Sequence, residues 1–241
     1  MASKKANKKK QYKKISIIIP AYNEEGYISR TLDSILQSMK YHPVGEVIVV
    51  ANACTDSTNK IVNKYKSDGI RLFITKKKGV SHAKNLGAKK ASSDILVFLD
   101  ADTSISKKAI KRIAALSEKY DFGSLWVKPF PMNIKSKFFM SLKNIVFAWG
   151  VYLGTNGILF CNVEIFNKVG GFKDTLKKRE DKDFVYSAIK HGKYRYIKSV
   201  YVETSMRRFE KKGYFWVIKY WVVNWVKEKL GKNNSEYPSI R

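Results

Sequence analysis

Short hydrophobic runs and helical hydrophobic patterns alternate through the first half of the chain. Four runs are typical of buried strands, at residues 15–19, 47–50, 71–75 and 95–99. Apolar residues three or four positions apart predict helices at about residues 26–39, 56–66, 81–90 and 107–120. Ser106 stands where it can cap the last of these helices. Strands that alternate with helices in this way predict an α/β fold with a mostly parallel sheet.

The pattern is less regular after residue 122. It predicts a strand near 125–127, an apolar helix around 137–152 and a strand at 157–160. A helix at about 181–190, a strand at 194–198 and a long aromatic helix at 213–230 complete the chain. Neither an internal repeat nor a linker is evident, so we expect one compact unit.

Composition fits a protein of this kind and indicates where it resides. The chain has 241 residues, 44% of them hydrophobic, which is enough for one α/β domain with a sizeable core. Cys54 and Cys161 have no metal-ligand spacing, and reduced thiols are typical of a cytosolic protein. Neither a secretory signal nor an apolar run of about 18–20 residues is present. We therefore expect a cytoplasmic protein, either soluble or peripheral on the cytoplasmic face of a membrane.

The charge is strongly positive, with 47 Lys and Arg against 20 Asp and Glu, a formal net charge of +27. Such a field attracts nucleic acid, anionic lipid head groups or phosphorylated substrates. Residues 1–14 concentrate part of the charge and predict a disordered basic tail. A nucleic-acid-binding or polyanion-binding protein is therefore one alternative, although no recognised nucleic-acid module is present.

Polar clusters follow three of the predicted strands, at residues 20–25, 51–56 and 100–103. Ligands of open α/β sheets bind outside the carboxyl ends of the strands. Any one cluster could be an ordinary loop, but three of them on neighbouring strands predict one crevice.

Asp100 and Asp102 are the strongest single feature of these clusters. Two carboxylates so close at the end of a buried strand repel each other unless a cation or a donor compensates. Oxygen ligands of this kind suit Mg²⁺ or Mn²⁺, which take one or two carboxylates together with substrate phosphate oxygens. The alternative is that Asp102 caps a helix and Asp100 is solvated, and the pair alone leaves both open.

The order of the motifs resembles a known family. The blocks are IIIPAYNEE at 17–25, VVANACTDST at 49–58, GVSHAKNLG at 79–87, FLDADT at 98–103, VGGF at 169–172 and REDKDF at 179–184. Together they resemble family 2 glycosyltransferases with the GT-A fold, over roughly residues 15–210. The resemblance implies a Rossmann-like, mostly parallel sheet flanked by helices. It also implies an inverting transfer of a sugar from a nucleotide-diphosphate sugar, carrying UDP or GDP, to an acceptor hydroxyl, with a divalent metal as cofactor.

The resemblance also divides the chain. The basic tail at 1–14 precedes a glycosyltransferase domain at 15–212, with a nucleotide-binding half at 15–103 and an acceptor half at 104–212. A C-terminal aromatic helix and tail follow at 213–241. The sugar, the acceptor and the linkage are not evident from the sequence.

Family positions carry over to the following candidate residues for nucleotide-sugar binding: Pro20, Ala21, Tyr22, Glu24, Asn52, Asp56, Lys84, Asn85, Asp100, Ala101 and Asp102. Asn52 departs from the family, which usually has an acidic residue there. An amide both donates and accepts hydrogen bonds, so Asn52 could accept a uracil imide proton or indicate a guanine donor. A solvated basic helix face is the alternative for Lys84, and His82 receives no role.

The resemblance makes Asp181 the general base, with Glu180 orienting the acceptor and Asp183 as the second candidate base. Their alternative role is the ordinary enrichment of acids in a first helical turn. Arg207 and Arg208 are candidates for the pyrophosphate, with surface charge as the alternative.

The aromatic helix at 213–230 either packs on the core or lies in an anionic membrane interface. A lipid-linked or membrane-borne acceptor would suit the second role. A pseudoenzyme of the same fold is a further alternative, but the expected carboxylates are all present.

Overall fold

The structure is a computed structural model that describes residues 13–150, 153–155, 157–176, 179–217, 219 and 223. Most of the predicted basic tail and most of the predicted aromatic helix lie outside these residues. In the part of that helix that is described, Tyr214 to Val217, Lys219 and Val223 are helical.

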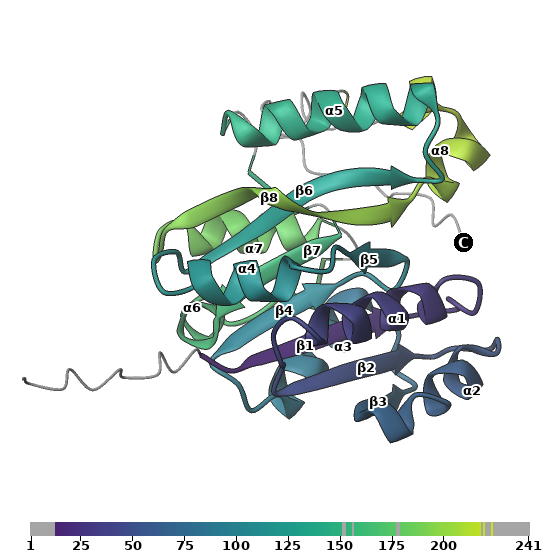
Figure 1. The fold of residues 1–241 in the computed structure, drawn as a ribbon, viewed down its shortest axis with the longest axis vertical. Coiled ribbons are helices and arrows are strands. Elements are labelled where there is room, and N and C mark those ends of the chain that lie inside the picture. The colour runs from purple at the N-terminus through teal and green to yellow at the C-terminus, as the bar shows by residue number, and fades with distance from the viewer. Residues whose placement is uncertain are drawn as a thin grey trace, which may run out of the picture.

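One eight-stranded sheet organises the molecule, in the order β3-β2-β1-β4-β7-β6-β8-β5 (Figure 1). The strands are β1 (Ile15–Ala21), β2 (Glu46–Asn52), β3 (Ile70–Thr75), β4 (Ile95–Leu99), β5 (Thr103–Ile105), β6 (Phe122–Phe130), β7 (Ile158–Asn162) and β8 (Tyr194–Ser205). The helices are α1 (Ile28–Met39), α2 (Thr58–Asn63), α3 (Val80–Lys90), α4 (Ala109–Leu116), α5 (Ile134–Ala148), α6 (Val163–Val169), α7 (Glu180–Ala188) and α8 (Arg207–Lys212), with a short 3-10 helix at Lys66–Asp68.

The first four strands form the parallel part of the sheet, as the hydrophobic pattern predicts. Alternate residues of β1 serve opposite faces: Ile17 and Ile19 pack in the core that includes α1, whereas Ile18 belongs to the opposite core. Helix α3 lies close on the second face, because a Cβ at Gly87 would come within 2.3 Å of Ile18 Cγ2. Burial on both faces explains why these strands are continuous apolar runs.

The second half adds strands of mixed direction. β7 is antiparallel to β4 and β6, β8 is parallel to β6, and the short β5 is antiparallel to β8. In the sheet, β1 lies between β2 and β4. The chain therefore adds β2 and β3 on one side of β1 and then returns to add β4 on the other side. Such a switch point leaves a crevice at the carboxyl ends of the strands. In Figure 1, α5 and α8 lie at one end of the molecule and β3 and α2 at the other.

Several predicted boundaries were wrong. The helix expected at 107–120 is shorter and has no side-chain cap, because the Ser106 hydroxyl accepts a hydrogen bond from the Tyr201 amide across the sheet, at 3.2 Å. The helix expected at 56–66 divides into α2 and the 3-10 helix. β5 and α6 were not expected, and β8 extends seven residues beyond the expected strand end at residue 198, to Ser205.

Candidate active site

The loops that follow β1 and β2 are tied together by side chains. Asn23 and Thr55 exchange hydrogen bonds, with the Thr55 amide donating to Asn23 Oδ1 at 2.8 Å. The Thr58 hydroxyl accepts from the Glu24 amide at 2.8 Å. Asn23 has a φ of +53°, in the left-handed region that asparagine tolerates better than most residues. These contacts join two of the three predicted polar clusters, those that follow β1 and β2.

Helix α1 holds the loop after β4 in the same place. The Thr31 hydroxyl donates to the Ala101 carbonyl at 2.7 Å, and Ala101 itself is buried. Asp100 donates its amide to the Gly157 carbonyl at 2.9 Å. Asp102 is followed directly by β5, so the alternative that it caps a helix is wrong.

Asp100 lies in a strongly acidic environment. Desolvation, together with the neighbouring charges of Asp181, Asp102 and Glu180, raises the pKa of Asp100 to about 7, although the Lys84 ammonium opposes this shift. No hydrogen-bond donor reaches the Asp100 carboxylate among the residues that the structure describes. The carboxylate is therefore held close to like charges, with Lys84 as the opposing cation.

Lys84 connects α3 with the first turn of α7. Its Nζ donates to Glu180 Oε1 at 2.9 Å and to Asp181 Oδ1 at 2.6 Å, and the residue is 2% exposed. Burial alone would lower the pKa of Lys84, but the charges of Asp181, Glu180 and Asp100 raise it well above its usual range. The alternative of a solvated basic face is wrong for Lys84, which is a permanent cation beneath the acidic cluster.

The first turn of α7 points two of its carboxylates into this cluster. Asp181 accepts from Lys84 and, through Oδ2, from the Thr155 hydroxyl at 3.0 Å. Asp183 pairs instead with the exposed Lys173, at 2.9 Å. The geometry thus separates Asp181 from Asp183.

Arg207 of α8 closes the other side of the site. Its Nη2 lies 2.7 Å from Glu24 Oε1 and 3.1 Å from Asp102 Oδ2, and its guanidinium lies over the Tyr27 ring. Hydrogen bonding to Glu24 and the charge of Asp102 raise the pKa of Arg207, against the effect of burial. Arg208 is exposed. Arg207 is thus a predicted arginine that contacts two carboxylates of the site.

Asn52 ends β2 and is buried at the same edge. Its Nδ2 donates to the Gly79 carbonyl at 2.8 Å, in the orientation that the hydrogen-bond network favours. Its Oδ1 is buried and accepts no hydrogen bond from the residues that the structure describes. Asn52 therefore has a buried acceptor atom without a donor among the described residues.

Other predicted binding residues brace the loops. Asp56 accepts from the Glu25 and Thr58 amides, and these hydrogen bonds lower its pKa although desolvation opposes them. Asn85 both donates to and accepts from the Phe172 backbone, at 2.7 and 2.9 Å. This contact fixes the turn before α7. Pro20 and Ala21 end β1 beside β2, and Tyr22 follows them.

Sequence reasoning missed Thr155, Tyr27 and Thr31. Their partners are 26, 180 and 70 residues away, so no local spacing could have revealed them. The sequence offers one weak indication of these residues, which is that each has a hydroxyl group and lies near a motif.

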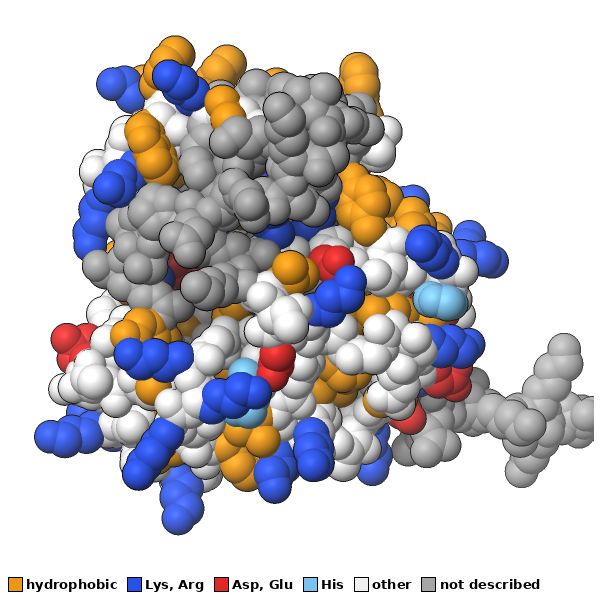
Figure 2. All heavy atoms as spheres, turned by 180° about the vertical axis from the view of Figure 1, so that it is seen from behind, with side chains coloured by type: hydrophobic (Ala, Val, Ile, Leu, Met, Phe, Trp, Pro, Cys, Tyr) orange, Lys and Arg blue, Asp and Glu red, His pale blue; other side chains and the backbone are white. Residues whose placement is uncertain are grey.

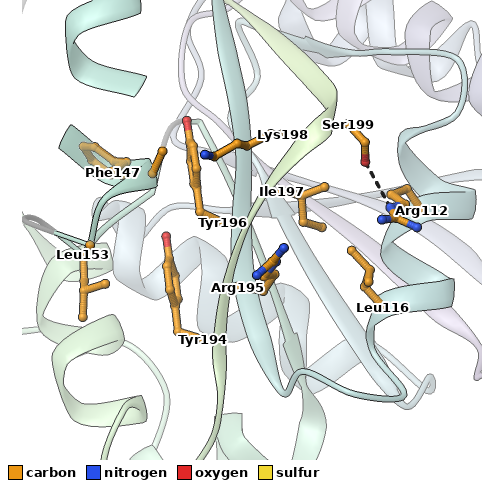
Figure 3. A pocket seen from close by; sticks show the side chains of 12 residues that line it. Arg112, Leu116, Phe147, Leu153, Tyr194, Arg195, Tyr196, Ile197, Lys198 and Ser199 are labelled. Atoms are coloured by element: carbon orange, nitrogen blue, oxygen red, sulfur yellow. Dashed lines mark hydrogen bonds between the residues drawn. The ribbon is translucent and has the colours of Figure 1, made fainter. Parts of the chain in front are cut away.

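A cavity of about 440 Å³ lies elsewhere, around the first part of β8 (Figure 3). Tyr194, Tyr196 and Lys198 project to one side of the strand, and Arg195 and Ile197 to the other. The residues that line the cavity include no carboxylate, so they offer neither a base nor a hard metal ligand. The acidic cluster, and not this cavity, is the candidate site.

An α/β fold with paired carboxylates at the switch point of its sheet is typical of enzymes that bind a ligand at this edge. Comparison with known proteins identifies the family. The model of glycosyl transferase family 2 matches residues 16–196. The chain belongs to this family. Residues 15–210, over which the motifs resemble the family, agree closely with the matched range.

Among known relatives, the poly(ribitol-phosphate) beta-N-acetylglucosaminyltransferase TarS of Staphylococcus aureus is 31% identical over 118 residues, 48% of this chain and 21% of TarS. The match thus spans about a fifth of that relative. A crystal structure of TarS 1–349 in complex with UDP-GlcNAc superposes with a TM-score of 0.65 at 22% identity, and covers 80% of this chain and 59% of that one. The mannosyltransferase PcManGT of Pyrobaculum calidifontis, in complex with GDP-Man and Mn²⁺, gives a TM-score of 0.67 at 20% identity, covering 80% and 57%.

These likenesses establish the GT-A fold that the motifs imply. They do not favour the alternative of a nucleic-acid-binding protein. No helix within the described residues is long and apolar enough to cross a membrane.

Proposed function

We propose that this protein is an inverting glycosyltransferase that moves a sugar from a nucleotide-diphosphate sugar to an acceptor hydroxyl. One observation carries the proposal: Asp100, at the end of β4 and next to Asp102, lies near Glu180 and Asp181 of α7, and Lys84 pairs with both of these α7 carboxylates. Acidic groups from both halves of the fold therefore meet where a donor and an acceptor would come together.

The donor side is built from the loops after β1, β2 and β4. TarS and PcManGT bind UDP-GlcNAc and GDP-Man, respectively. The buried Oδ1 of Asn52 is an acceptor for a base N–H, which both uracil and guanine possess. Nδ2 donates to the Gly79 carbonyl, so Oδ1 is the atom of Asn52 that would take the place of the family's carboxylate as an acceptor. We infer that Pro20, Ala21 and Tyr22 line the same pocket.

The residues fit a divalent cation. Asp100 has a carboxylate with a raised pKa, close to other negative charges, and an added cation would relieve this repulsion. Within the described ranges no group of three His, Cys, Asp or Glu side chains could hold a metal by itself. Asp100 and Asp102 would thus be two ligands of an ion completed by donor phosphate oxygens, as Mg²⁺ and Mn²⁺ prefer. Such an ion supplies charge neutralisation for the departing nucleoside diphosphate.

The chain's own residues prepare the transfer. Arg207 lies beside Asp102, where its guanidinium can donate to an incoming pyrophosphate. Asp181 is fixed by Lys84 and Thr155, yet each carboxylate oxygen keeps a second acceptor position. We infer that Asp181 takes the proton of the attacking hydroxyl, as one base in a single displacement requires. Glu180, held by the same Lys84, orients the acceptor.

The experiment is a panel of UDP-, GDP- and dTDP-sugars with Mn²⁺, read by thermal stabilisation and by release of nucleoside diphosphate. At least one donor should stabilise the protein and be turned over, with water or an added hydroxyl compound as acceptor. Asp102→Ala should abolish the Mn²⁺ dependence, whereas Asp68→Ala, an exposed carboxylate in the 3-10 helix, should not. Stabilisation by a donor without any turnover would favour the pseudoenzyme, and no response to any donor would reject the proposal.

A further inference from the structure

The outer face of α5 is a continuous stripe of large apolar side chains. Ile134 is 89% exposed, Phe138 64%, Leu142 52%, Ile145 43% and Trp149, which caps the helix, 79%. Their spacing of four, four, three and four residues places them on one side of a helix. We call these five residues the α5 stripe.

The opposite face of α5 fixes the helix, so the stripe cannot turn inward. Asn144 is 1% exposed, and it accepts from the Val127 amide at 3.0 Å and donates to the Val127 carbonyl at 2.8 Å. The Tyr196 hydroxyl also donates to Asn144, at 2.6 Å. Met140 and Phe147 are buried on the same side. Exposed apolar surface of this kind in a firmly anchored helix indicates a partner.

The charges around the stripe indicate what that partner is. α5 carries Lys135 and Lys137 near the stripe and contains no acidic residue, while its third lysine, Lys143, is partly buried. Next to it, Tyr214 stacks on Phe139 of α5, with ring centroids 5.0 Å apart, and the adjacent Phe215 is 83% exposed. Figure 2 shows hydrophobic side chains projecting among Lys and Arg side chains at the upper end of the molecule, the end where α5 lies in Figure 1.

We propose that the α5 stripe docks on an anionic lipid surface. Apolar side chains flanked by lysines, on a helix that lies along the surface, are the features with which helices bind in the bilayer interface. The alternative of a second copy of this chain is disfavoured by charge, because it would bring two cationic faces of a +27 protein together.

The position of α5 suggests how docking on a membrane would serve the candidate site. Tyr214 contacts both Phe139 of α5 and Phe209 of α8, with ring centroids 5.0 and 5.2 Å apart. The helix that carries the stripe is therefore connected to α8, which contributes Arg207 to the site. A membrane-borne acceptor would be presented at the site, but the docking itself does not depend on the proposed catalytic function.

The test is co-sedimentation of the full chain with phosphatidylcholine vesicles and with mixed phosphatidylcholine–phosphatidylglycerol vesicles. The wild-type protein should bind the mixed vesicles and bind the neutral ones much more weakly. Phe138→Ser with Leu142→Ser should lower binding by at least about tenfold, because two large apolar side chains no longer enter the interface. Ile74→Ser, which removes a 64% exposed side chain from β3, is the matched control and should bind as the wild type.

Circular dichroism and donor stabilisation of the stripe variant should match the wild type, so that misfolding is not mistaken for lost docking. Vesicle binding that is absent in the wild type, or unchanged in the stripe variant, would overturn the proposal. A wild-type dimer in light scattering that the stripe substitutions convert to a monomer, without vesicle binding, would replace the lipid surface with a second copy of the chain.

Discussion

Replacement of Lys84 by methionine removes a buried cation that contacts both Glu180 and Asp181. The three side chains are 3%, 11% and 26% exposed, so water screens their charges only in part. Methionine fills a similar volume, but it leaves two carboxylates without their ammonium partner, close to a third at Asp100. Breaking a buried ion pair in this way costs about 3–5 kcal/mol.

The free energy of unfolding, measured by urea denaturation, should therefore fall by about 3–5 kcal/mol in Lys84→Met. For a chain of this size, such a loss corresponds to a Tm lower by roughly 10 °C. Lys77→Met is the matched control, since the Lys77–Asp174 pair is 61% and 39% exposed. A surface pair of that kind is worth about 0–1 kcal/mol at most.

A second variant separates charge from packing. Glu180→Gln and Asp181→Asn together, added to Lys84→Met, remove the unpaired charges and should recover more than half of the lost stability. A loss below about 1 kcal/mol in Lys84→Met would refute the claim that Lys84 stabilises the contact between α3 and α7. A triple variant no more stable than Lys84→Met would show that packing, and not charge, explains the loss.

Three further predictions concern the donor, the base and the sheet. Asn52→Ala should weaken nucleotide-sugar binding about tenfold in calorimetry, since it removes the buried acceptor. An unchanged Kd would show that Asn52 does not bind the nucleobase. Thr155→Val should leave donor binding intact and lower kcat several-fold, because Asp181 loses a hydrogen bond that orients it; equal kcat would remove Thr155 from the mechanism. Desolvation raises the pKa of Glu46, but hydrogen bonds from Ser16 and Ser92 and the Arg71 charge outweigh it and leave the pKa below 4.5. A depressed pKa adds stability above pH 4.5 that is lost as the pH falls through the folded value. Glu46→Gln should thus be less stable than the wild type by about 1–3 kcal/mol at pH 7, and this difference should shrink in acid. A difference that stays constant in urea titrations down to about pH 3 would contradict the lowered pKa of Glu46.

Local pattern was enough to predict the parallel half of the fold. Strands such as β1 and β4 are buried on both faces, so their apolar runs are continuous and easily recognised. The later strands are less evident because their partners are distant. β5 has only three residues, and its pairing with β8 depends on Thr204, about a hundred residues away.

The site was predicted in part for the same reason. The carboxylates follow strands or open a helix, so their positions are visible in the sequence. What they contact is not. In the sequence, Lys84 is compatible with a solvated lysine, and its contact with α7 is seen only in the folded structure. Arg207 contacts Glu24 because the fold brings α8 next to the loop after β1.

The central claim is that Asp181 acts on an acceptor while the strand-end carboxylates serve the donor. Release of nucleoside diphosphate by Asp181→Asn, measured at saturating donor and Mn²⁺ beside donor affinity, tests this claim most directly. The account predicts a Kd for the donor within about twofold of the wild type, and turnover lower by about a hundredfold or more. Turnover equal to the wild type would contradict the role of Asp181 as the base.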